Sequence, residues 1–125
     1  MTRSDEVVLV VRNFKWSKVL EQLIAADGYG IKYLYSLDEA AAFLTSCRAR
    51  AVVVGVQPFS HKDRLAARRC RRLAPRTALV ALANESTPLW QLTPTLDWEA
   101  TALLIWPTER DRVLAALGSG TQRAR

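Results

Sequence analysis

The stretch Ala51-Val52-Val53-Val54-Gly55-Val56 decides the fold, and Gln57-Pro58 ends it. It contains no polar side chain, which is typical of a central strand in a parallel sheet that is covered by helices on both faces. In open parallel sheets, ligands bind and reactions take place at the carboxyl ends of such strands. This strand ends without a carboxylate, so apolar residues fill the position where a reactive group is expected.

Four further segments have strand patterns, and segments with helix patterns separate them. The expected strands are residues 7–11, 31–35, 51–56, 78–82 and 101–105. The expected helices are residues 17–26, 36–47, 62–73 and 108–117, with a short or irregular helix within 84–98. This alternation predicts an α/β fold with a five-stranded parallel sheet and helices on both faces.

Local signals support several of these boundaries. Ser36-Leu37-Asp38-Glu39 has the capping-box pattern that begins a helix, and Gly28 follows a helix at the usual stop position. Apolar spacing predicts which residues each helix buries. The expected buried stripes are Val19, Leu20, Leu23 and Ile24 in the first helix, and Leu65, Ala66, Cys70 and Leu73 in the third. Cys47 and Cys70 are expected on apolar helix faces, where a free thiol packs as a small hydrophobe.

Length and composition indicate one domain over residues 1–118, followed by a flexible basic tail or linker over 119–125. The chain has 125 residues, a formal net charge of +6 and one histidine. It has no apolar run long enough to cross a bilayer and no apolar segment of a secretory signal near Met1, so we expect a cytoplasmic protein without membrane contact. A single histidine and bare strand ends predict neither a metal site nor an enzyme.

Three segments, in their order along the chain, resemble the receiver domain of two-component response regulators. They are a strand over 7–11 followed by a polar pair, the strand over 51–56 followed by Pro58, and Leu103-Leu104-Ile105-Trp106-Pro107 before a capped helix. The resemblance covers about residues 7–117. It implies the CheY-like, flavodoxin-like (βα)5 fold with strand order 2-1-3-4-5.

The family transfers a phosphoryl group to an aspartate with the help of Mg²⁺, an acid pair, a Thr or Ser and a lysine. The matching positions here carry none of these groups. They are Arg12 and Asn13 for the acid pair, Val54 or Gly55 for the acceptor, Ala83 for the hydroxyl and Trp106 for the lysine.

These changes oppose phosphoryl chemistry. Mg²⁺ requires oxygen ligands, and neither Val54 nor Gly55 supplies a side-chain oxygen or a nucleophile. A guanidinium about 5 Å from Mg²⁺ costs about 6–7 kcal/mol at an effective dielectric constant of about 20. A millimolar site is worth about 4 kcal/mol. We therefore expect no metal, no cofactor and no aspartyl phosphorylation. Trp106 either fills the vacated polar pocket or packs over the sheet edge.

Two surfaces are candidates for binding a partner. The first is formed by Trp90, Trp98, Leu103 and Trp106, in the region that commonly mediates dimerisation or output-domain contact in receivers. Aromatic residues are enriched in interface cores, although these tryptophans could instead complete the protein core. The second is the arginine-rich helix over 62–73, where Arg64, Arg68, Arg71 and Arg72 could bind nucleic acid or another anion. Its alternative is an ordinary solvated helix face.

The sequence therefore predicts a degenerate, or pseudo-, receiver: a non-catalytic module that binds a protein partner, a fused output domain or a second copy of itself, independently of phosphorylation. We expect it to act in bacterial signal transduction or transcription control. The alternative is a nucleic-acid or anion-binding module that uses the arginine-rich helix.

Overall fold

The computed structural model describes residues 6–11, 17–55, 61–84, 100–106 and 110–117. Its sheet has five parallel strands in the order β2-β1-β3-β4-β5. The strands are β1 (Glu6–Val10), β2 (Gly30–Tyr33), β3 (Ala51–Gly55), β4 (Ala78–Asn84) and β5 (Ala102–Trp106). The described helices are α1 (Ser17–Ala26), α2 (Leu37–Leu44), α3 (His61–Leu73) and α6 (Arg110–Leu117). The predicted fold class and strand order are confirmed.

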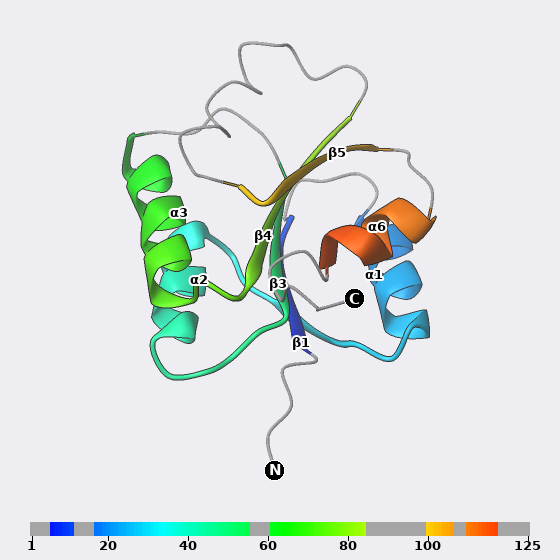
Figure 1. Cartoon of the computed structure of the whole chain (residues 1–125), viewed down its shortest axis with the longest axis horizontal. Coiled ribbons are helices and arrows are strands. Elements are labelled where there is room, and N and C mark those ends of the chain that lie inside the picture. Colours follow the sequence, from blue (N-terminus) through cyan, green and yellow to red (C-terminus); the bar gives the residue numbers. More distant parts are fainter. Residues whose placement is uncertain (1–5, 12–16, 56–60, 85–99, 107–109, 118–125) are drawn as a thin grey trace.

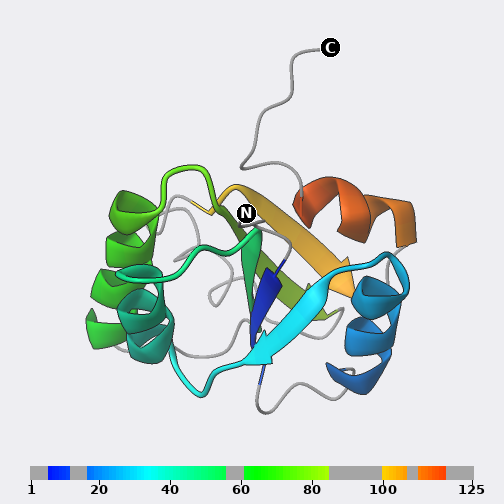
Figure 2. The same cartoon turned by 90° about the horizontal axis from the view of Figure 1, so that it is seen from below.

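Two helical layers enclose the sheet. Figures 1 and 2 show α2 and α3 side by side on one face, with α1 and α6 on the other. Successive residues of a strand point to opposite faces, so each strand contributes to both layers. In β3, Val53 belongs to the cluster under α1 and α6, whereas Val52 and Val54 belong to the cluster under α2 and α3. This two-sided burial explains the continuous apolar run of β3.

The capping box before α2 is confirmed. The backbone N–H of Glu39 donates to the Ser36 hydroxyl oxygen at 3.2 Å. The Glu39 carboxylate in turn accepts from the backbone N–H of Tyr35 at 2.6 Å. These bonds satisfy donors that the first turn of a helix leaves without intrahelical partners, so the local sequence fixes where α2 begins. Gly28 also has the expected role, because its φ of 94° lies in the region that glycine adopts most readily.

Several predicted boundaries shift. β2 ends at Tyr33 rather than residue 35, while β4 continues to Asn84 and β5 to Trp106. The last two strands extend one another, since Ala83 pairs with Ile105 and Asn84 with Trp106. Strand length here depends on a neighbour more than twenty residues away in the chain, which local patterns do not reveal. The helix predicted within 84–98 lies mostly outside the described residues.

The predicted buried stripe of α3 is wrong at both leucines. Leu65 and Leu73 are 45% and 40% exposed, whereas Ala66 and Cys70 are buried. Ala67, which the prediction omitted, is also buried. α3 packs closely beside α2, and its small side chains permit this approach, so the helix turns its alanines inward and leaves both leucines on its flanks.

Two smaller predictions also fail. Val19 is 46% exposed, although Leu20 and Ile24 in the same predicted stripe are fully buried. Cys47 is exposed because α2 ends at Leu44, before reaching it. The Thr45 hydroxyl donates to the carbonyl oxygen of Ala42 at 2.6 Å within this helix end. Cys70 is buried as predicted. Among the described residues, no helix is both long and apolar enough to cross a membrane.

Candidate functional site

The carboxyl edge of the sheet is where the resemblance places the phosphorylation site. The register aligns the strand ends, because Val10 pairs with Val54, and Gly55 pairs with Leu82 of β4. Parallel strands therefore bring the predicted positions on β3, β4 and β5 to one edge, which is the upper edge in Figure 1. The described residues at these strand ends carry no carboxylate.

Both candidate acceptor positions lie at the end of β3. The Val54 side chain is 1% exposed and packs in the cluster under α2 and α3. Gly55 is the last residue of the strand and is partly exposed. Neither side chain contains an oxygen atom that could accept a phosphoryl group or coordinate Mg²⁺. The end of β3 thus continues the apolar core up to the edge of the sheet.

The positions on β4 and β5 lie inside the strands rather than after them, which corrects the prediction. Ala83 is 1% exposed and pairs with Ile105, and Trp106 is the last residue of β5. A buried alanine methyl group cannot donate a hydrogen bond to a phosphoryl oxygen. Val54, Gly55 and Ala83 therefore offer no side-chain group that could bind a phosphate.

Arg12, Asn13, Trp90 and Trp98 lie outside the described residues. Within the described part of the chain, no group of three or more His, Cys, Asp or Glu side chains could hold a metal ion.

A scan against protein-family models and a search of curated proteins found no match. Solved structures do match. The receiver domain of a sensor histidine kinase from Pseudomonas aeruginosa, with a magnesium ion coordinated in its active-site cleft, has a TM-score of 0.75 and 20% identity. The alignment covers 94% of this chain and 99% of that one.

Two further structures agree. The signal receiver domain of an HD-domain-containing protein from Pseudomonas fluorescens has a TM-score of 0.76 at 20% identity, covering 97% of this chain and 89% of its own. A CheY-like receiver domain from Methanospirillum hungatei has a TM-score of 0.70 at 12% identity, covering 90% of each chain. This chain has the receiver-domain fold. At these identities the likeness establishes the architecture, and the phosphorylation chemistry has to be argued from this chain's own residues.

β5 contributes an exposed apolar surface to this receiver fold. Leu103 and Ile105 are 42% and 41% exposed, and alternation places both on the same face of the strand. Their neighbours Ala102 and Leu104 pack against the cluster on the α1 and α6 side. Leu103 was among the residues of the predicted interaction face, whereas Ile105 was not. The alternation of β5 was the signal that could have identified Ile105.

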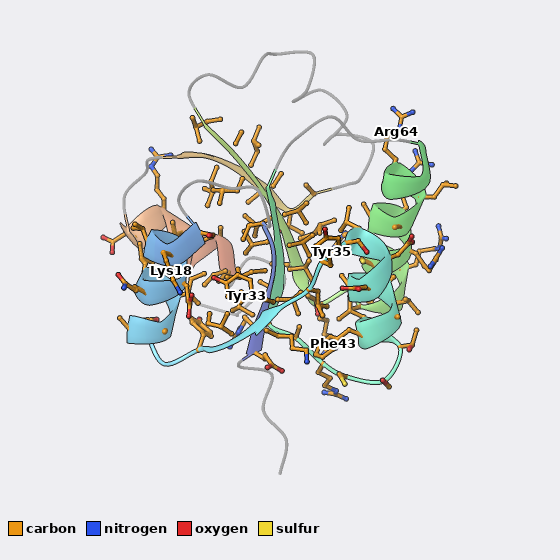
Figure 3. The ribbon with its side chains drawn as sticks, turned by 180° about the vertical axis from the view of Figure 1, so that it is seen from behind. Lys18, Tyr33, Tyr35, Phe43 and Arg64 are labelled. Carbon is orange, nitrogen blue, oxygen red and sulfur yellow. The ribbon has the colours of Figure 1, made fainter. Side chains whose placement is uncertain are left out.

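The arginines of α3 are in different environments. Arg68 and Arg72 are exposed and Arg64 is partly exposed; Figure 3 shows Arg64 pointing outward from the start of the helix. Arg71 is partly buried, and its guanidinium Nη1 donates to the carbonyl oxygen of Thr77 at 3.3 Å. Arg71 therefore helps to hold the connection from α3 to β4. Arg69, which was not among the predicted anion-binding residues, is exposed on the same helix.

A groove at the opposite, amino edge of the sheet was not predicted. It has a volume of about 650 Å³ and lies between the connection from α2 to β3 and the connection from α3 to β4. Its charged lining side chains are Arg48 and Arg76, both exposed, and none of its lining residues is acidic. The two connections are about 28 residues apart in the chain, so the groove exists only once the sheet has formed.

Among the residues that the structure describes, two side chains have a clearly shifted pKa. Burial raises the pKa of the Cys70 thiol to about 11, with the nearby Asp38 carboxylate adding to the shift and Arg69 opposing it. Desolvation raises the pKa of the Tyr33 hydroxyl to about 12, supported by its hydrogen bond to the Glu21 carboxylate at 2.9 Å. Both groups are therefore protonated near neutral pH, and neither is poised as a nucleophile or a general base there.

Proposed function

We propose that this chain is a pseudo-receiver, a non-catalytic module that binds a protein partner or a fused output domain without being phosphorylated. The observation that carries the proposal is the end of β3, where the resemblance assigns the phosphoryl acceptor to buried Val54 or to partly exposed Gly55. Buried Ala83 on the neighbouring strand supports it, because this residue lacks the hydroxyl group that would bind a phosphoryl oxygen. A cytoplasmic place in bacterial signalling or transcription control is part of the same proposal.

The chemistry of the edge explains why such a module would signal differently. A phosphorylated receiver gains negative charge at this edge, and the new charge redistributes two conformations of the domain. An edge of valine, glycine and alanine cannot acquire that charge. The domain then keeps one surface permanently available for binding, and the concentration of the partner regulates how much of the domain is bound.

The test is incubation with acetyl phosphate, or with beryllofluoride, in the presence of Mg²⁺. We expect an unchanged intact mass and unchanged amide chemical shifts for this chain. A receiver domain that binds magnesium serves as the matched positive control and should respond to both treatments. A mass increase of one phosphoryl group on this chain, with shifts at the ends of β3 and β4, would overturn the proposal.

The proposed partner surface is the exposed side of β5, with Trp90, Trp98 and Trp106 as further candidates. Leu103 and Ile105 offer apolar area that a second copy or an output domain can bury. A homodimer would show a doubled mass in light scattering at high protein concentration. Changing both residues to Ser should return the mass to that of a monomer, whereas Val19→Ser, at a similarly exposed residue on α1, should not.

A strictly monomeric wild-type chain would remove the homodimer and leave the partner or fused output domain as the occupant of this surface. Loss of partner binding in Val19→Ser but not in the β5 variant would contradict the placement of the surface on β5.

A nucleic-acid or anion-binding function is the second candidate, and the exposure of Arg68, Arg69 and Arg72 on α3 favours it. Binding through phosphate contacts weakens steeply as salt is added. We therefore expect such binding to be tight at low salt and to disappear near physiological salt. Absence of binding to duplex or single-stranded DNA at low salt would eliminate this candidate.

A further inference from the structure

α3 carries a stripe that combines apolar and cationic side chains on its solvent side. Leu65, Arg69, Arg72 and Leu73 are spaced i, i+4, i+7 and i+8, so they share one face of the helix. All four are exposed, with Leu65 at 45% and Leu73 at 40%. At a rise of about 1.5 Å per residue, the stripe is about 12 Å long. It borders the buried face of the helix, which Ala66, Ala67 and Cys70 form, and Leu73 is the member nearest to that face.

The stripe leads directly into the groove at the amino edge of the sheet. Leu73 belongs to both, because it is the last residue of α3 and also lines the groove. Beyond it, the groove adds Pro75 and the exposed guanidinium groups of Arg48 and Arg76. The stripe and the groove therefore form one continuous surface of leucines and arginines, which we call the α3 surface.

Internal hydrogen bonds hold the groove in shape. The buried Thr77 hydroxyl donates to the carbonyl oxygen of Ala49 at 2.7 Å, which joins the two connections that form the groove. The guanidinium of Arg71 donates to the carbonyl oxygen of Thr77, and the backbone N–H of Ala78 donates to the carbonyl oxygen of Arg50 at 3.1 Å. A surface built in this way loses little conformational freedom when it binds a partner.

The charge of the α3 surface is not neutralised within the described residues. There, the side chains of Arg48, Arg69, Arg72 and Arg76 take part in no ion pair or hydrogen bond. The carboxyl ends of α2 and α3 also lie at this edge, and each supplies about half a negative charge. Four guanidinium groups outweigh these two helix ends, so the surface keeps a net positive charge of about three.

We propose that the α3 surface binds an acidic segment of another protein that carries apolar anchor residues. Charge complementarity selects Asp and Glu side chains to pair with the arginines. The two exposed leucines distinguish this partner from a nucleic acid, since a phosphate backbone buries no apolar area against them. The inference does not depend on the proposed function, because the α3 surface is separate from β5 and from the carboxyl edge.

The probe is a fluorescent peptide of about twelve residues, rich in Glu, with two leucines placed eight residues apart. Two comparison probes share its charge: the same peptide with both leucines changed to Ser, and a single-stranded DNA. Fluorescence anisotropy at about 50 mM salt, where charges are weakly screened, measures each affinity for the whole chain. We expect the leucine-containing peptide to bind about fivefold more tightly than its Ser counterpart.

Two double variants separate charge from apolar contact. The double variant Arg48→Glu with Arg76→Glu should lower the affinity for both peptides by tenfold or more, since electrostatic attraction becomes repulsion. The double variant Leu65→Ser with Leu73→Ser should abolish the difference in affinity between the two peptides. Its affinity for the Ser peptide should stay that of the wild-type chain. The matched control is Lys18→Glu with Arg112→Glu, which changes the net charge by the same amount at exposed residues of α1 and α6. This control should alter the affinity for either peptide less than twofold.

The alkylation rate of Cys47 reports whether the peptide occupies the groove. Its thiol is exposed and lines the groove, whereas the thiol of Cys70 is buried. Bound peptide should slow the alkylation of Cys47 in the wild-type chain and in the control variant. All variants change exposed residues, and an unchanged circular dichroism spectrum verifies that each is folded.

Three results would overturn the proposal. The first is absence of peptide binding at low salt. The second is DNA binding that is tighter than peptide binding and is lost in the Arg48 and Arg76 variant, which would assign the surface to nucleic acid. The third is equal affinity for both peptides, which would reduce the interaction to charge alone.

Discussion

The two edges of the sheet differ in both chemistry and origin. The carboxyl edge, where a receiver fold ordinarily places its chemistry, carries Val54, Gly55 and Ala83 within the last residue pairs of its strands. The amino edge, where the helix-to-strand connections lie, carries a groove lined by Arg48 and Arg76 among other residues. The comparison shows that a fold fixes where strand ends gather but not which side chains stand at each edge.

The largest expected effect comes from placing a carboxylate at the carboxyl edge. Val54→Asp buries a charge among the side chains under α2 and α3, and should destabilise the fold by about 3–5 kcal/mol. Val54→Ala, which removes volume without adding charge, should cost about 1–3 kcal/mol. Urea unfolding measures both. If Val54→Asp unfolds at the same urea concentration as wild type, the edge is more open than the buried valine indicates.

The two cysteines sharpen the contrast between the groove and the core. Cys47 lines the groove and is exposed, while burial raises the pKa of Cys70 to about 11 and excludes reagents from it. Near neutral pH we expect Cys47 to react with a thiol reagent at least about a hundredfold faster than Cys70. Counting modified thiols over time should give one in the native chain and two after denaturation. Two rapidly reacting thiols in the native chain would contradict the burial of Cys70.

A smaller effect is expected at the start of α2, where the chain leaves β2 at the carboxyl edge. Ser36→Ala removes the hydroxyl group that accepts the Glu39 N–H, and should cost about 1 kcal/mol. Ser36→Asp keeps an acceptor and should remain within a few tenths of a kcal/mol of wild type. Thermal unfolding measures both variants. An equal loss for Ala and Asp would show that the cap contributes little.

The smallest effect concerns Tyr33 on the edge strand β2. Its pKa is about 12 in the folded chain against 10.0 in the unfolded one. The bound proton therefore stabilises the fold at pH values below 10, and this contribution is lost as the pH rises from 10 to 12. Tyr33→Phe should flatten that part of the stability profile relative to wild type. Urea unfolding at several pH values measures the stability of both chains. Identical profiles would show that Tyr33 does not cause the loss of stability between pH 10 and 12.

Sequence patterns predicted the parts that depend on near neighbours in the chain. The bounds of α1, the capping box of α2 and the five-stranded parallel sheet were all expected from spacing and resemblance. The bare end of β3 was also visible, because a missing carboxylate is a property of the sequence itself. Val54 and Gly55 form the end of β3, whereas Ala83 lies inside β4 and not after it as expected. The assignment of these three residues to phosphorylation-site positions stays a prediction.

Predictions that depended on which helix face turns inward were less successful. Leu65 and Leu73 were expected in the core, but the tight pairing of α2 and α3 through small side chains leaves them on the flanks of α3, 45% and 40% exposed. The helical period identifies a face, whereas the neighbouring helix decides how the helix is rotated. The same limitation hid the groove, because Arg48 and Arg76 meet only through β3 and β4.

The sequence by itself determined the α/β architecture and the side-chain types at the strand ends, since apolar periodicity and side-chain type are local properties. Only the tertiary structure decided which leucines and arginines share a surface. Packing α3 beside α2 and pairing β3 with β4 brings residues from distant parts of the chain to one edge, and no local pattern records that juxtaposition.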